Sequence, residues 1–129
     1  MPESKTVSGE IEVVGGCAYY RPVGKTTLEQ AVDLVDQALA YARDRRIPKL
    51  FFSALGLIGM RSPSLPERYF FVRRWAATGQ GLVQVAMVIH AEMIDPEKFG
   101  VTVAHNSGLH ADVFPSEPEA LDWLLAERD

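Results

Sequence analysis

The residue types of a phosphate site occur in the stretch RPVGKTT, residues 21–27, where a Gly-Lys-Thr triplet lies between a predicted strand and a predicted helix. A phosphate-binding loop needs glycine-rich backbone N–H groups around the phosphate and a lysine that reaches it. Here Tyr19 stands where such a loop has its first glycine, and Pro22 lacks an N–H group. We therefore interpret Lys25 and the two threonines as the start of a helix, and the sequence predicts no nucleotide or other cofactor.

Three histidines and two nearby acids have the side chains that metals most often use. His90, His105 and His110, with Glu92 and Asp95, contain no pair at the spacing of a known zinc site on one element, so we predict no metal site. His90 and Glu92 directly follow a predicted parallel strand. Ligands of open α/β sheets bind outside such strand ends, so a bound molecule or partner is expected there.

Two side chains, Ser53 and Cys17, carry the hydroxyl or thiol group of a possible nucleophile. Ser53 lacks the glycine pattern of a nucleophile elbow, and Cys17 lies on a predicted edge strand rather than at a helix N-terminus that would activate it. Cys17 is interpreted as a small apolar residue. Because no catalytic constellation is found, the sequence predicts a protein without enzymatic activity.

A group of arginines and aromatic residues lies in one region of the chain. Its cations suit an acidic partner or the head group of an anionic ligand, although an ordinary solvated face has the same composition. Phe70 and Phe71 are adjacent, so at least one must point away from the buried face of a helix. The predicted partner or ligand surface consists of Arg61, Arg68, Phe70, Phe71, Arg73, Arg74, His90 and Glu92.

Size and charge restrict the class of protein. The 129 residues fit a single domain, 1–129, and the net charge of −4 argues against a non-specific nucleic-acid binder. One cysteine precludes an internal disulfide and suits a reducing compartment. The first ten residues lack the apolar core of a signal peptide, and no run approaches a membrane span. We therefore expect a cytoplasmic protein that does not bind nucleic acid.

Strand and helix patterns alternate along the chain. A hairpin is predicted from strands at 6–14 and 17–23, turned at Gly15-Gly16. The later elements are a helix from a cap at Thr26 or Thr27, a strand at 49–54, a helix from a cap at Ser62 or Ser64 to residue 77, a strand at 82–90, a short helix at 96–106, a strand at 109–114 and a helix from a cap at Ser116. The order ββαβαβαβα predicts an α/β fold with a mixed, mostly parallel sheet of about five strands and about four helices.

The helix predicted at 62–77 has an apolar stripe. Residues at three-and-four spacing predict its buried face, which would consist of Leu65, Tyr69, Val72, Trp75 and Ala76.

Four segments carry a family resemblance. They are RPVGKTTLEQAVDLVDQAL after the hairpin, LFFSALGLIGMRSPSL, VQVAMVIH and the closing VFPSEPEALDWL. In this order they resemble the STAS fold of anti-sigma-factor antagonists and, more closely, the SpoIIAA-like branch of uncharacterised bacterial proteins. The resemblance covers most of the chain and implies a STAS-like domain.

The same resemblance implies one modification site. In the antagonist branch, the loop after the central strand carries Asp-Ser-Ser-Gly, whose first serine is phosphorylated by a partner kinase. That motif falls here on Arg61, Ser62, Pro63 and Ser64, of which only Ser62 matches in its position. Ser62 is therefore a candidate regulatory phosphosite.

Two functional hypotheses follow. The first is a STAS-like regulatory module that acts through protein contact and forms a homodimer. The alternative is a binding protein for a small apolar or amphipathic, lipid-like ligand, since SpoIIAA-like domains resemble lipid-binding CRAL-TRIO domains in architecture. An exposed aromatic patch would favour the partner, and an enclosed cavity would favour the ligand. The predicted pocket lies between the helices at 62–77 and 96–106 and the strand ends, and its lining residues are Met60, Phe70, Phe71, Met93 and Phe99.

Overall fold

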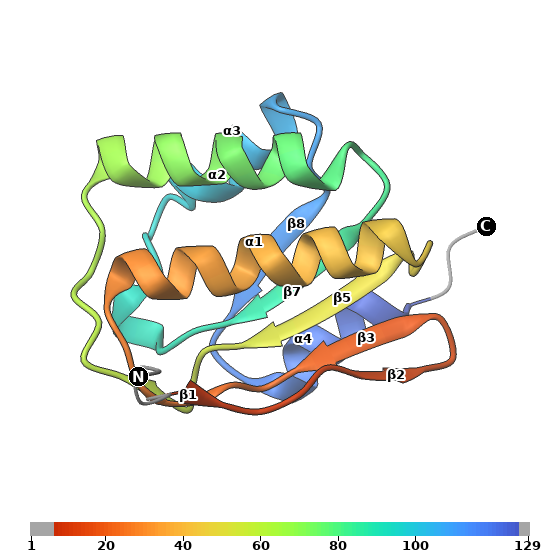
Figure 1. The fold of residues 1–129 in the computed structure, drawn as a ribbon. Helices are drawn as coiled ribbons and strands as arrows, with labels where there is room; N and C mark the ends of the chain where they lie inside the picture. The colour runs from red at the N-terminus through yellow and green to blue at the C-terminus, as the bar shows by residue number, and fades with distance from the viewer. Residues whose placement is uncertain (1–6, 127–129) are drawn as a thin grey trace, which may run out of the picture.

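The computed structural model describes residues 7–126, which form a five-stranded sheet with helices on both faces (Figure 1). The strands of this sheet are β2 (Glu12–Val14), β3 (Cys17–Tyr20), β5 (Lys49–Ser53), β7 (Gln84–Val88) and β8 (Ala111–Phe114). They lie in the order β2-β3-β5-β7-β8, with β2 antiparallel to β3 and the other neighbours parallel. The predicted mostly parallel sheet with an antiparallel edge is confirmed.

Strand β5 is the centre of the sheet. Its apolar run is buried on both faces, as the sequence predicted, because β3 and β7 flank it and helices cover it above and below. Leu50 and Phe52 face one hydrophobic cluster, and Phe51, between them, faces the other. This alternation follows from the two-residue period of a strand.

The N-terminal hairpin differs from the prediction. Gly15 and Gly16 form the expected turn, both with positive φ. However, the segment before them splits into β2 and a separate β1 (Val7–Ser8), which pairs with β4 (Val23–Lys25) instead. The cause is Gly9, which has a φ of +128° and passes so close to the carbonyl of Arg21 that a Cβ would lie 3.2 Å from its oxygen. Residue 6 of the predicted strand lies outside the described residues.

The second predicted strand, 17–23, is also divided. Pro22 is buried and has no N–H for a strand ladder, so β3 ends before it and β4 begins after it. β4 joins a small second sheet of order β1-β4-β6, in which β6 (Leu57–Ile58) was not predicted. Two residues are too few to show a strand period.

Three of the four α-helices in the described residues begin after a predicted capping residue, namely Thr27, Ser64 or Ser116. The four helices are α1 (Leu28–Asp44), α2 (Leu65–Gly79), α3 (Phe99–Asn106) and α4 (Glu117–Leu125), with a short 3₁₀ helix, η1 (Ala91–Met93). Thr27 and Ser64 each form a complete capping box, so Ser64 rather than Ser62 caps α2. Within residues 7–126, no helix is both long enough and apolar enough to cross a membrane.

The predicted start of the third helix was wrong. Pro96 is not its first residue, because α3 begins at Phe99 after Lys98 adopts a left-handed conformation with a φ of 52°. The N-cap residue is Lys98 rather than the predicted Asp95, although the Asp95 Oδ2 accepts a hydrogen bond of 2.8 Å from the Phe99 amide. The segment before it forms η1, which allows the chain to turn over the end of β7.

The helices form unequal layers. α1, α2 and α3 share one hydrophobic cluster with the sheet, and α4 covers the opposite face with a smaller cluster. α2 packs mainly against α1 and α3, rather than on the strands, as its position along the upper rim of Figure 1 shows. The buried Trp75 Nε1 donates a hydrogen bond to the Val32 carbonyl of α1. α2 therefore covers a space that is bounded by α1, α3 and the sheet.

Candidate functional site

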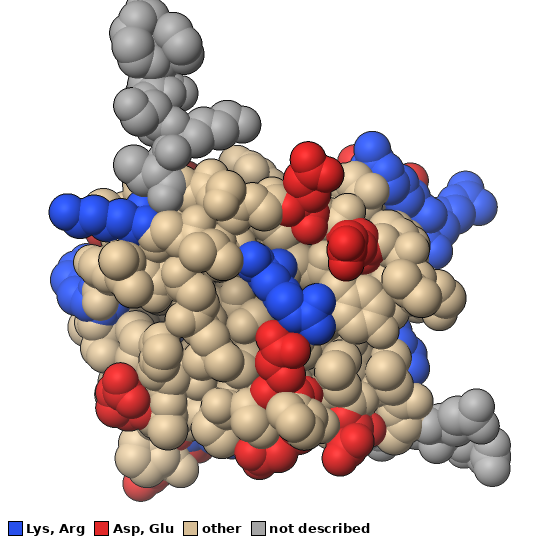
Figure 2. All heavy atoms as spheres, turned by 90° about the horizontal axis from the view of Figure 1, so that it is seen from below, with Lys and Arg blue, Asp and Glu red and all other residues tan. Residues whose placement is uncertain are grey.

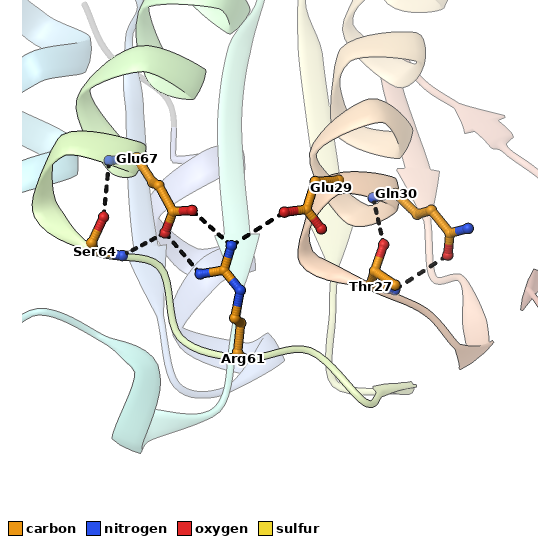
Figure 3. A network of polar contacts seen from close by, with 6 residues as sticks. All are labelled: Thr27, Glu29, Gln30, Arg61, Ser64 and Glu67. Carbon is orange, nitrogen blue, oxygen red and sulfur yellow. Dashed lines mark hydrogen bonds and ion pairs between the residues drawn. The ribbon is translucent and has the colours of Figure 1, made fainter.

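An arginine joins the loop after β6 to two helices (Figure 3). Both terminal nitrogens of Arg61 donate to the Glu67 carboxylate, at 2.8 and 2.7 Å, and Nη2 also donates to Glu29 of α1 at 3.2 Å. Glu67 in turn accepts a hydrogen bond from the Ser64 amide at 2.9 Å, which completes the capping box of α2. The network fixes the loop at the N-terminal end of α2.

This network changes the titration of its members. Hydrogen bonds from Arg61, and then from the Ser64 backbone, lower the pKa of Glu67 to about 2, and the Glu67 carboxylate raises the pKa of Arg61. Arg61 was predicted to face a partner, but its charge is compensated by two acids of the same chain.

Arg74 is also compensated within the chain. It pairs with Asp33 at 2.8 Å and with Asp36 at 3.4 Å, and Asp36 additionally accepts a hydrogen bond from Thr78. Its pKa is raised, chiefly by the hydrogen bond to Asp33. Arg74, which was predicted to face a partner or ligand, thus connects α2 to α1.

The remaining two arginines of α2 contact no carboxylate within residues 7–126. Arg68 Nη2 donates to the Met93 carbonyl at 3.2 Å. Arg73 Nη1 donates to the Tyr69 hydroxyl at 2.8 Å, and its guanidinium lies 5.5 Å from the centre of the same ring. These two arginines keep their charge available, on opposite sides of α2.

The outer face of α2 carries an aromatic patch, which consists of Leu65, Tyr69, Phe70 and Arg73. Phe70 is 70% exposed, and its ring packs edge to face against the ring of Tyr69, with 5.4 Å between the two ring centres. Leu65 and Tyr69 were predicted to be buried, but both are exposed because α1 and α3 leave this side of α2 uncovered. A shallow groove between α2 and α3 borders the patch, with Asn106 on its far side.

The inner face of α2 closes an apolar cavity of about 130 Å³. Buried side chains of α1 and α2 and the strand floor make most of its wall, including Val35, Phe52 and Trp75. At one end the lining residues are only half-buried, among them Pro63 and Ile94, so the cavity reaches the surface beside the loop that precedes α2.

The predicted pocket is correct in part. Met60, Phe71 and Met93 line the cavity, as expected. Phe70 does not, because it occupies the outer face of α2, and Phe99 packs against the core without lining the cavity. The adjacent phenylalanines thus point in different directions, which their helical spacing requires.

Polar groups gather at the half-buried end of the cavity. They are Arg68, Asp95, Lys98 and Asp112. Lys98 Nζ pairs with Asp112 at 2.8 Å, and Asp95 accepts from the first amide of α3. The sequence did not reveal Lys98 and Asp112, since they are far apart in the chain and only the packing of α3 against β8 brings them together.

Ser62 is exposed in the loop and has Arg61 as its neighbour. His90 is half-buried at the start of η1, and Glu92 within η1 is exposed. Both lie past the end of β7, as predicted. Among the described residues, no group of three His, Cys, Asp or Glu side chains could hold a metal ion.

The two nucleophile candidates are buried. Burial raises the pKa of the Cys17 thiol, which disfavours the reactive thiolate. Ser53 Oγ accepts a hydrogen bond from the Leu55 amide and serves the turn after β5.

Charges are mixed on the face that Figure 2 shows, which is the side of β2, β3 and α4 in Figure 1. Acidic and basic side chains are scattered there among uncharged ones, without a broad field of one sign.

Sequence comparison identifies no relative. No family model matches the chain, and no curated protein matches it.

Solved structures do match. An anti-sigma factor antagonist from Mycobacterium paratuberculosis has a TM-score of 0.59 at 15% identity, covering 98% of this chain and 100% of that one. An uncharacterized protein with a SpoIIAA-like fold from Shewanella loihica has a TM-score of 0.51 at 19% identity, covering 96% and 98%. The anti-sigma factor antagonist SpoIIAA in its unphosphorylated form has a TM-score of 0.51 at 13% identity, covering 93% and 100%. The chain therefore has the STAS-like, SpoIIAA-like fold that its sequence predicted.

Proposed function

We propose that this chain is a non-enzymatic regulatory module that binds an acidic protein partner through the aromatic patch of α2. The observation that carries the proposal is the exposure of Phe70 beside Tyr69 and Arg73. Aromatic and arginine side chains dominate the binding energy of protein interfaces, and a monomer gains nothing by exposing such a cluster.

The charge of the patch determines the kind of partner. Arg73 contacts no carboxylate within residues 7–126, so a carboxylate of the partner can pair with it. A second copy docked symmetrically through the patch would bring arginines of the two helices together, which disfavours self-association there. The similar fold of two antagonists of anti-sigma factors, which by name act on another protein, supports a protein partner.

Ser62 is the proposed switch of this interaction. It is exposed and adjoins Arg61, whose guanidinium holds Glu67 and Glu29. A phosphate on Ser62 would compete for that guanidinium and add negative charge near the patch, which would weaken the docking of an acidic partner. Phosphorylation would appear as a mass increase in the protein isolated from its own cells.

Photo-crosslinking tests the proposed interface. A photoreactive phenylalanine analogue at position 70, expressed in the source organism, should crosslink one abundant partner, and the same analogue at exposed Leu82 should not. The partner is then identified by mass spectrometry, purified and titrated by calorimetry. Phe70→Ala should weaken its binding about tenfold or more, as expected for an interface anchor.

Charge reversal provides the second arm. Arg73→Glu should abolish binding and Arg73→Lys should retain part of it, while Leu82→Ala serves as the neutral surface control. The proposal is wrong if the identified partner binds the Phe70→Ala and Arg73→Glu variants as tightly as the wild type.

A second candidate function rests on the cavity. An apolar space of about 130 Å³ that reaches the surface has the size of engineered cavities that bind benzene. We propose that it binds a small apolar molecule. Toluene added at millimolar concentration should shift the amide resonances of α1, α2 and α3 in NMR spectra.

A cavity-filling variant makes this test specific. Gly100 lines the cavity, and a Cβ placed there would meet only the Val72 side chain, at 3.8 Å. Gly100→Leu should fill the space and remove the toluene shifts. Absence of any shift in the wild type would overturn the candidate.

The homodimer and the cytoplasmic location stay predictions from the sequence. Sedimentation velocity over a range of protein concentrations tests the homodimer, and fractionation of the source cells tests the location.

A further inference from the structure

The polar end of the cavity indicates which apolar molecules it selects. We propose that the ligand is a small hydrophobic carboxylic acid, whose tail occupies the cavity and whose carboxylate binds Arg68. This inference rests on the second candidate function and adds the chemical class of the ligand.

The size of the cavity limits the tail. About 130 Å³ accommodates a phenyl ring or a chain of similar volume, and not a long-chain lipid. The deep wall consists of buried side chains such as Leu39, Val85 and Trp75, which provide no polar partner for a ligand atom. Trp75 Nε1 is already used by the Val32 carbonyl. A head group must therefore lie at the half-buried end.

The charges at that end are unequally compensated. Lys98 and Asp112 neutralise each other at 2.8 Å, and Asp112 also accepts from the Val113 amide. Asp95 accepts from the Phe99 amide, and the N-terminus of α3 partly offsets its charge. Of the two cations at this end, Lys98 pairs with a carboxylate, whereas Arg68 donates its hydrogen bond to a neutral group, the Met93 carbonyl. Within residues 7–126, it has no anionic partner.

The position of Arg68 suits a carboxylate. It is half-buried, lines the cavity, and extends from α2 to the carbonyl of η1 across the open end. A guanidinium has five N–H donors, and the hydrogen bond to Met93 uses one of them. The others can bind both oxygens of a carboxylate, an arrangement that lysine cannot reproduce.

Two probes with the same carbon skeleton test this inference. Phenylacetate ends in a carboxylate, and 2-phenylethanol has a neutral hydroxymethyl group in its place. Calorimetric or NMR titration of the wild-type chain should give an affinity for phenylacetate about tenfold higher, since a charge-assisted hydrogen bond stabilises more than a neutral one. The amide shifts of α2, α3 and η1 locate the site.

Variants on the two sides of α2 separate a specific contact from a general charge effect. Arg68→Gln should reduce phenylacetate affinity to that of 2-phenylethanol and leave 2-phenylethanol binding unchanged. Arg73→Gln makes the same change of net charge on the outer face and should affect neither probe.

Each outcome decides the question. Equal affinity for the two probes would contradict the proposal that the ligand is a carboxylic acid. Equal losses of phenylacetate affinity in Arg68→Gln and Arg73→Gln would contradict it as well. In both cases the cavity remains a ligand site. If neither probe binds and toluene shifts no resonance, both the carboxylic-acid ligand and the second candidate function are wrong. Tighter binding of the alcohol also rejects the carboxylate.

Discussion

The two faces of α2 have similar compositions and opposite environments. The outer face exposes Tyr69, Phe70 and Arg73 to solvent, whereas the inner face places Phe71 and Trp75 against α1 and the cavity. Each face combines aromatic residues with one arginine that lacks a carboxylate partner within residues 7–126, Arg73 outside and Arg68 inside. Composition alone therefore does not determine what a helical face does.

Neighbouring helices produce the difference. α1 and α3 flank α2 and cover the side that faces the sheet, and nothing in the described chain covers the other side. Because α2 stands away from the strands, the inner face retains a cavity instead of a filled core. In the two proposed functions, the outer face of α2 binds a protein and the inner face forms one wall of a site for a small molecule.

The largest expected difference is between Trp75 and Phe70. Trp75→Ala removes a ring that is 7% exposed, together with its hydrogen bond to Val32, and should lower the free energy of unfolding by about 3–5 kcal/mol. Phe70→Ala should change it by less than about 0.5 kcal/mol, because that ring is mostly in solvent. Urea denaturation followed by circular dichroism measures both. Equal losses would show that the two faces are not energetically distinct.

A smaller effect is expected opposite the inner face, at Gly100. Gly100→Ala should raise the free energy of unfolding by about 0.5–1 kcal/mol, since alanine favours a helix and its Cβ would meet Val72 at an ordinary contact distance of 3.8 Å. The matched control is Gly108→Ala, which should destabilise the protein because Gly108 has a φ of +87°. Stabilisation by both substitutions would contradict this account.

Local signals in the sequence were sufficient for most of the fold. The caps at Thr27 and Ser64, the apolar run of β5 and the alternation of strands and helices predicted the elements and the sheet. The strand break at Gly9 was missed because it depends on a close approach to the backbone of Arg21 and Pro22. The break at Pro22 was missed because a proline was expected to be tolerated near the end of a continuous strand.

The candidate sites were less predictable. The run Tyr69-Phe70-Phe71 indicated that some aromatic residue must be exposed, but helical spacing also placed Tyr69 on the buried stripe, and it lies outside. The ion pairs of Arg61 with Glu29 and of Arg74 with Asp33 join α2 or its loop to α1 across more than thirty residues, so no local pattern contains them. The pairing of Lys98 with Asp112 likewise exists only after α3 packs on β8.

Substitution of Arg74 should destabilise the protein slightly more than substitution of Arg73. Arg73 is the arginine whose charge is available to a partner, and Arg74 is the one used within the fold. Arg74→Ala breaks exposed pairs with Asp33 and Asp36 and should cost about 0.5 kcal/mol at low salt, declining as salt screens the charges. Arg73→Ala should cost less, because Arg73 forms no ion pair with any carboxylate among residues 7–126. Urea denaturation at two salt concentrations measures the difference. A larger, salt-independent loss at Arg73 would mean that the patch belongs to the fold rather than to a partner.

The network of Arg61, Glu67 and Ser64 lies at the N-terminal end of α2. The pKa of Glu67 is lowered in the folded protein from 4.5 to about 2, so its carboxylate stabilises the fold fully above pH 4.5 and loses this contribution as the pH falls toward 2. Glu67→Gln should therefore flatten the dependence of the unfolding midpoint on pH in this window, as thermal denaturation at successive pH values would show. Arg61→Gln should reproduce part of the flattening, because the Ser64 amide remains to lower the pKa of Glu67. An unchanged slope in Glu67→Gln would mean that the network does not anchor the loop, and that Ser62 could be modified without disturbing α2.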